Sequence, residues 1–125
     1  LLKMGDLRQA LEAYQNGQGL AEELATADPK SAESRFEMAL FHSKVGKAYA
    51  ALAARISLPS GQSIERWRNA RSLFQRSLDI LLELQSRGAL RALQAGEPER
   101  IKKELARCDA ALAGFQRSTA RTGRQ

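Results

Sequence analysis

Apolar residues recur at helical spacing in four segments of this chain, and the breaks between the segments are rich in Pro, Gly or Ser. Such spacing predicts amphipathic helices, which we place at about residues 6–27, 32–56, 64–87 and 98–115. Short oxygen-bearing side chains cap helix starts well, and the first three segments begin near Asp6, Ser31 and Ser63. Because short connections favour antiparallel neighbours, the expected fold class is all-α, either a stack of antiparallel helical hairpins or a four-helix bundle.

The second and fourth segments differ in how much of their surface is apolar. The second carries two stripes, one running through Met38, Phe41, Val45 and Leu52 and the other through Phe36, Ala39 and Leu40. A helix with such wide apolar coverage packs on more than one side, so we expect an interior helix. The fourth has one narrow stripe of Ile101, Leu105, Cys108, Leu112 and Phe115, which suits a capping helix at the end of a stack.

Three glycines and one short segment bear on the helix boundaries. Gly17 and Gly19 interrupt the first helix at a cost of about 1 kcal/mol each relative to Ala, and we expect close packing against a neighbour to offset it. Gly88 is expected to end the third helix. Between Gly88 and Pro98, Leu90 and Leu93 are candidates for a short helical turn that packs on the bundle.

The chain of 125 residues is long enough for one domain, which we assign to residues 1–116. The apolar periodicity stops there, so residues 117–125, with three arginines, are expected to form a basic disordered tail. The formal net charge of +6 allows a nucleic-acid partner, with the third helix supplying Arg66, Arg68, Arg71 and Arg76. Basic and acidic residues alternate along the helices, however, which indicates solvated faces.

Candidate catalytic chemistry is sparse. His42 is the single histidine and has no second histidine or cysteine at metal-ligand spacing, so neither a metal nor a cofactor is expected, and the protein is not expected to be an enzyme. Cys108 lies on an apolar stripe and is expected to be buried. One cysteine favours a cytoplasmic setting. No apolar run approaches the roughly 20 residues of a membrane span, so membrane insertion is not expected.

Four short patterns carry a family resemblance. They are Val45-Gly46-x-x-Tyr49, Gly5-Asp6-Leu7 followed by Ala10 and Tyr14, the boundary Asp28-Pro29, and Ala70-x-x-x-Phe74. Together they resemble the tetratricopeptide repeat family over residues 5–84. His42 stands where that pattern prefers Trp, and the connection after Tyr49 is too long for the period of about 34 residues. The resemblance is therefore to long-helix variants.

The resemblance implies a fragment of a right-handed solenoid with a C-terminal capping helix. Ala10 and Gly46 would allow close helix approach next to Val45 and Ala70, while Tyr14, Tyr49 and Phe74 fill the gaps. First helices line the concave groove in this family, which implies groove positions at Leu40, Ser43, Lys44, Lys47 and Ala51. Lys44 and Lys47 are three residues apart, so both ammonium groups can reach an acidic peptide or a terminal carboxylate; the alternative is that they only keep the groove hydrated.

The expected function is a protein-interaction or scaffold module without catalysis of its own. Its partners would be a protein or peptide of acidic character and upstream domains of the same chain, since similar segments close the repeat regions of large multidomain bacterial proteins. The alternative is a cap or self-association element of a longer array, with the first helix dimerising through Leu7, Leu11 and Tyr14. Nucleic-acid binding is the third and weakest reading.

Overall fold

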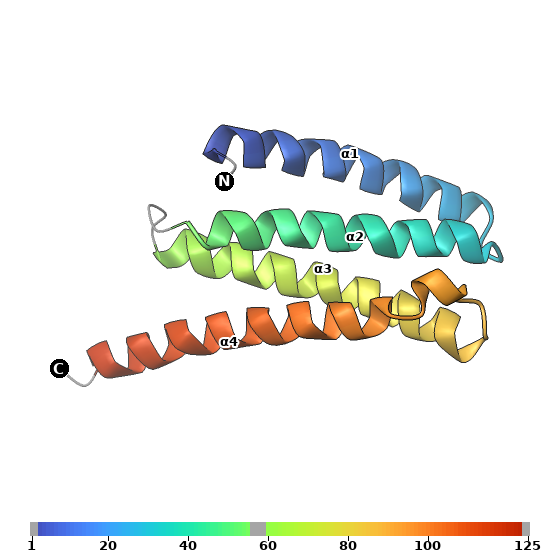
Figure 1. The fold of residues 1–125 in the computed structure, drawn as a ribbon. Coiled ribbons are helices and arrows are strands. Elements are labelled where there is room, and N and C mark those ends of the chain that lie inside the picture. Colours follow the sequence, from blue (N-terminus) through green and yellow to red (C-terminus); the bar gives the residue numbers. More distant parts are fainter. Residues whose placement is uncertain (1–2, 56–59, 124–125) are drawn as a thin grey trace.

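The computed structural model describes residues 3–55 and 60–123, except for the side chains of Met4 and of residues 118–123. The described chain contains four α-helices, one short 3-10 turn and no strand, which confirms the all-helical prediction. The helices are α1 (Met4–Ala27), α2 (Ala32–Ala53), α3 (Ser60–Ser86) and α4 (Glu97–Gly123), and the turn η1 (Ala92–Gln94) lies before α4. Figure 1 shows the helices side by side in chain order, each antiparallel to the next.

Each helix packs mainly on its neighbours in the sequence, namely α1 on α2, α2 on α3, and α3 on α4. The main apolar cluster lies among α2, α3 and α4, and α1 contributes no residue to it. Its largest buried members are Trp67, Phe74, Leu78, Ile80, Leu81, Leu84, Ile101 and Leu105. As predicted, α2 is an interior helix, with partners on two sides.

Small residues let α2 and α3 approach closely. A Cβ atom at Gly46 would lie 3.1 Å from the nearest atom of the Phe74 ring, so the missing side chain makes room for that ring. Nearby, the buried Ser77 hydroxyl donates a hydrogen bond to the Ala39 carbonyl at 2.8 Å. Ala39 and Phe74 are both fully buried. The predicted role of Gly46 in close packing is thus observed at this interface.

The predicted helix starts are partly correct. Ser31 caps α2, because its hydroxyl accepts a hydrogen bond from the Ser34 amide at 3.1 Å. The Asp6 prediction is wrong, since α1 begins at Met4 after Lys3, which makes no side-chain capping bond. The Ser63 prediction is also wrong. The helix α3 begins at Ser60, so Ser63 lies in its first turn, where only 5 % of its surface is exposed.

The end of α3 follows the prediction for Gly88. This residue has a φ of 65°, in the left-handed region that glycine tolerates. Ala89 N–H donates to the Leu84 carbonyl at 2.8 Å and Gly88 N–H donates to the Gln85 carbonyl at 3.0 Å, which is a Schellman cap. Leu90 then packs on the core. Leu93 is 99 % exposed, so the packing predicted for it is wrong.

Two other boundaries differ from prediction. The helix α2 ends at Ala53, and its predicted last turn includes Ile56, which lies outside the described residues. The helix α4 begins at Glu97 with Pro98 in its first turn, as expected, but continues to Gly123 rather than ending near Phe115. The predicted domain boundary at residue 116 thus falls within α4, and the disorder predicted for residues 117–125 stays a prediction.

Within the described residues, no helix combines the length and the hydropathy that crossing a bilayer requires.

Candidate protein-interaction face

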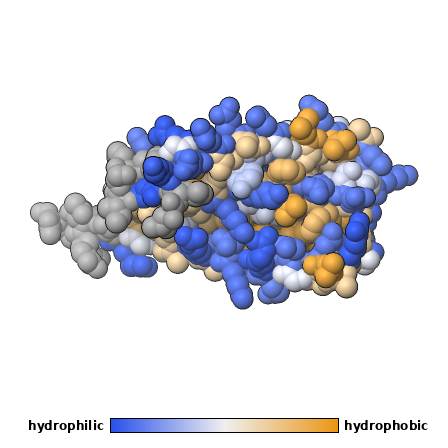
Figure 2. All heavy atoms as spheres, turned by 45° about the horizontal axis from the view of Figure 1, so that its top comes forward, coloured by the Kyte–Doolittle hydropathy of each residue, from blue (hydrophilic) through white to orange (hydrophobic). Residues whose placement is uncertain are grey.

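An apolar hollow of about 310 Å³ opens between the second half of α1 and the first half of α2. Leu20 and Leu24 of α1 border it, and each is 62 % exposed, whereas most large apolar side chains of α3 are buried. Phe41 lines its base, and Glu33 and Glu37 of α2 line the opposite rim. In Figure 2, orange side chains interrupt the blue surface over the half of the molecule that holds the α1–α2 connection.

The base of the hollow depends on a glycine. A Cβ atom at Gly17 would overlap the Phe41 ring, so only glycine lets that ring lie against the α1 backbone. The close packing predicted for Gly17 is confirmed. The same prediction for Gly19 is wrong, because a Cβ there would meet nothing within 4 Å. We infer that Gly17 fixes the spacing of the two helices, while Gly19 only weakens the helix.

A line of side chains continues from the hollow along the outer side of α2. It contains Glu33, Glu37, Leu40, Lys44, Lys47 and Ala51, which follow one another at alternating steps of four and three residues. Residues at this spacing lie along one side of a helix, and all six are exposed or half-buried. Together with Leu20, Leu24 and Phe41, they form what we call the α1–α2 face.

Four of the five predicted groove residues belong to this face, and Ser43 does not. Leu40, Lys44 and Ala51 are half-buried and Lys47 is exposed. The Lys44 ammonium lies 4.8 Å from the centre of the Phe41 ring, a cation–π distance. Ser43 is only 2 % exposed, and its hydroxyl donates to the Leu40 carbonyl at 2.8 Å. This burial leaves Ser43 outside the α1–α2 face.

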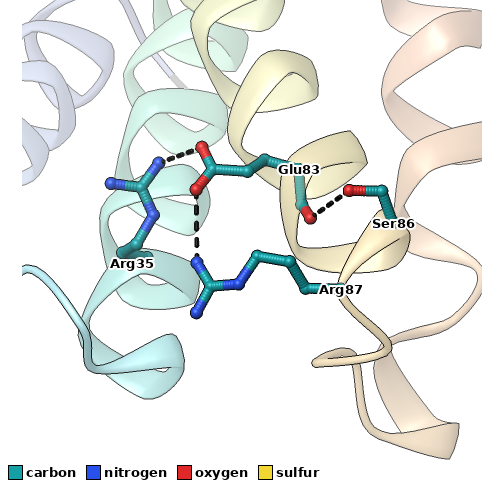
Figure 3. A network of polar contacts seen from close by, with 4 residues as sticks. All are labelled: Arg35, Glu83, Ser86 and Arg87. Atoms are coloured by element: carbon teal, nitrogen blue, oxygen red, sulfur yellow. Dashed lines mark hydrogen bonds and ion pairs between the residues drawn. The ribbon is translucent and has the colours of Figure 1, made fainter.

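The charged side chains of the α1–α2 face have no ion-pair partners among the described residues. Ion pairs occur elsewhere: Glu83 accepts from Arg35 at 2.7 Å and from Arg87 at 3.3 Å (Figure 3). Others join Arg71 to Asp109, Arg100 to Glu97 and Lys102 to Glu99. The four charges of the face, namely Glu33, Glu37, Lys44 and Lys47, are therefore available to a partner.

The residues assigned to repeat packing occupy two different environments. Val45, Gly46, Ala70 and Phe74 are all buried, and Gly46 and Phe74 meet between α2 and α3. Ala10 and Tyr14 on α1 are half-buried. Tyr49 is half-buried as well; its hydroxyl accepts a hydrogen bond from Gln15 of α1 at 3.1 Å, and the Arg66 guanidinium lies 5.9 Å from its ring centre.

His42 lies on the other side of α2 and contacts Gln18, which lines a polar hollow of about 250 Å³ between α1 and α3. The ring is 4 % exposed, and its Nδ1 lies 2.6 Å from Gln18 Nε2. Burial lowers the pKa of His42 below its ordinary value; the Glu22 carboxylate opposes this shift and Arg76 adds to it. No group of three metal-ligating side chains occurs in the part of the chain that the structure describes. His42 is a packed, hydrogen-bonded residue here.

Cys108 is 1 % exposed and belongs to the core, as predicted. Burial is the main cause that raises the pKa of its thiol to about 11, and Glu104 adds to the shift. A thiol with so high a pKa is a poor nucleophile at neutral pH.

The arginines of α3 do not form one strip. Arg71 pairs with Asp109 of α4, whereas Arg66 lies over Tyr49 of α2 and Arg76 lines the polar hollow beside Glu22. Since these side chains turn to different neighbours, the geometry gives little support to a continuous phosphate-binding surface.

Comparison of the chain with models of known protein families, with curated proteins and with solved structures found no match. Sequence reasoning missed Leu20, Glu33 and Glu37 as members of the face. A usable signal was present, since Gly17, Leu20 and Leu24 repeat at steps of three and four residues.

Proposed function

We propose that this protein is a non-catalytic helical module that binds a protein partner through the α1–α2 face. The observation that carries the proposal is the pair of leucines, Leu20 and Leu24, left 62 % exposed beside an open apolar hollow. Apolar side chains gathered in a hollow and rimmed by charge are typical of protein-interaction surfaces. A partner that covers the two leucines would remove their apolar surface from water.

The charges of the face favour a partner that carries basic groups at one end and acidic groups at the other, rather than one that is acidic throughout. Glu33 and Glu37 lie at the α1–α2 connection, and Lys44 and Lys47 lie further along α2. Electrostatic complementarity of this kind selects partners and fixes their register. We propose that the lysines do bind acidic groups, as expected from the sequence, but as one half of a bipolar surface.

The tetratricopeptide resemblance fits this proposal. It assigns α2 to the first-helix position, whose exposed side lines the groove, and four of the five groove positions it implies are accessible. We propose a tetratricopeptide-like hairpin arrangement in which α2 and α3 form one hairpin, α1 precedes it and α4 caps it. A cap or self-association element of a longer array is the alternative.

Site-specific photo-crosslinking in the cells that make the protein tests the proposal. A photoreactive phenylalanine analogue replaces Leu24 or Ala51 on the face, and replaces the exposed Arg68 on α3 in the control. Protein adducts are expected at Leu24 and Ala51 and not at Arg68. Absence of adducts at both face positions, or equal adducts at Arg68, would refute binding through this face.

A further inference from the structure

The charges on α2 are arranged antisymmetrically about Leu40. Glu33 and Lys47 lie seven residues to either side of it, while Glu37 lies three before it and Lys44 four after it. These residues span roughly 21 Å of helix at about 1.5 Å per residue. A half-turn about an axis perpendicular to α2 at Leu40 therefore exchanges each acidic position with a basic one. The line is complementary to itself in the antiparallel direction.

The spacing of the line is that of a helix–helix seam. Its alternating steps of four and three residues average 3.5, the period along which a second helix packs in a left-handed bundle. The helix α1 carries a matching line of Ala13, Gly17, Leu20 and Leu24 with the same steps. Two adjacent helices thus present parallel seams on one side, which is the surface that an antiparallel hairpin offers to another hairpin.

The side chains of the α1 line differ in size on the two sides of its centre: Ala13 and Gly17 are small, and Leu20 and Leu24 are large. Gly17 lies against Phe41 and Gln18 bonds His42, so the level of Leu40 on α2 corresponds to the region of Gln18 on α1. The half-turn that exchanges the charges then places Leu20 near the Gly17 position and Leu24 near the Ala13 position of the opposite copy. Large side chains face small ones, the arrangement that lets helix surfaces interdigitate.

We infer that the partner on the α1–α2 face is the same face of a second copy. The two α1–α2 hairpins form an antiparallel four-helix bundle about a two-fold axis. This inference rests on the proposed function and names its partner. Glu33 pairs with Lys47 of the second copy and Glu37 with its Lys44, and two-fold symmetry makes each pair occur twice. A parallel arrangement would set like charges opposite each other.

The dimer also accounts for the exposed leucines. Leu20 and Leu24 enter the centre of the bundle, where each meets the backbone of the other α1. On the far side of α2, Glu97, Arg100 and Ile101 at the start of α4 line a small cavity together with Phe36 and Leu40. The open part of the face is thus the part that the second hairpin covers.

A charge-swap experiment on the full chain tests the inference. One variant carries Lys44→Glu and Lys47→Glu, the other Glu33→Lys and Glu37→Lys, and a matched control carries Arg68→Glu and Lys103→Glu on exposed positions outside the face. Analytical ultracentrifugation measures the dimer dissociation constant against the monomer mass of 13.8 kDa. Circular dichroism verifies that every variant remains helical.

Wild type and control are expected to dimerise alike, and each face variant alone is expected to dissociate at least about tenfold more readily because its face carries one sign of charge. Mixing the two face variants in equal amounts should restore a dimer of twice the monomer mass. A dimer that the face variants leave unchanged, or variants that do not recover on mixing, would overturn the inference. So would a wild type that stays monomeric at millimolar concentration.

The photo-crosslinking result separates this failure from failure of the proposed function. If the wild type is monomeric but Leu24 and Ala51 crosslink to another protein, the face binds a partner and only the second-copy inference is lost. If neither self-association nor any adduct is found, both proposals fail. A dimer with crosslinks between copies at Leu24 supports both.

Discussion

The first helix and the remaining three are held together in different ways. The helices α2, α3 and α4 share a core of large buried side chains, among them Trp67, Phe74, Leu81 and Ile101. The buried apolar residues of α1 are Leu7, Ala21 and Ala25, two of them small, and polar bonds from Gln15 and Gln18 supplement them. The comparison shows that the second half of α1 docks through small and polar groups, which leaves Leu20 and Leu24 outside.

The two regions are expected to differ most in how much free energy of unfolding is lost when a large apolar side chain is truncated to alanine. Phe74→Ala removes a fully buried ring and is expected to lower the free energy of unfolding by about 3–5 kcal/mol. Leu24→Ala truncates a side chain that is mostly exposed and is expected to change it by about 0.5 kcal/mol or less. Urea denaturation at low protein concentration measures both. Equal losses would contradict the proposed division of the core.

The two glycines of α1 provide a finer comparison, because they share a helix and differ only in surroundings. Gly19→Ala is expected to stabilise the protein by about 1 kcal/mol through helix propensity. Gly17→Ala gains the same propensity but pushes against the Phe41 ring, and overpacking of this kind costs about 1–3 kcal/mol. Thermal denaturation should rank Gly19→Ala above Gly17→Ala. The double variant Gly17→Ala, Phe41→Leu should recover part of the loss.

The smallest expected effect is the pH dependence contributed by His42 at the α1–α2 contact. Its pKa is lower in the folded protein than its ordinary value of 6.5, so the unfolded chain takes up the proton first. The contribution of His42 to the free energy of unfolding is therefore fully present above pH 6.5. It is lost as the pH drops toward the folded pKa, by at most about 1.4 kcal/mol per pH unit. Denaturation midpoints between pH 5 and 8 measure it.

His42→Gln is the control for this prediction, since glutamine keeps a polar group but does not titrate. The variant should show a flatter profile across the same range. If wild type and variant have parallel profiles, His42 does not contribute the dependence, and its bond to Gln18 has no titratable role in holding α1.

The helices and their order were predictable because apolar residues at helical spacing mark the side of each helix that is buried. The pattern identified α2 as interior and placed Cys108 in the core. Helix starts were less predictable, since Asp6 and Ser63 have the chemistry of caps but the helices begin before them. Capping requires a backbone that turns out of the helix, and residue type alone does not specify where that turn occurs.

The candidate face was predictable on α2 but not on α1. Heptad-like spacing marks Leu40, Lys44 and Lys47 as one side of a helix. The family resemblance also implied Ser43 as a groove position, and the structure buries that residue. Which side of α2 stays open depends on where α1 and α4 dock, and that is decided by long-range packing. The exposure of Leu20 and Leu24 was hidden for the same reason, because an apolar residue at helical spacing is normally assigned to the core.

The sequential order of the helix contacts has a consequence for how the chain folds. Since α1 packs mainly on α2, α2 on α3 and α3 on α4, the main interfaces join segments that are adjacent in the chain. Proteins dominated by such local contacts fold quickly, within microseconds to milliseconds. Because the last three helices share the main core, we expect them to form first and α1 to dock on them late.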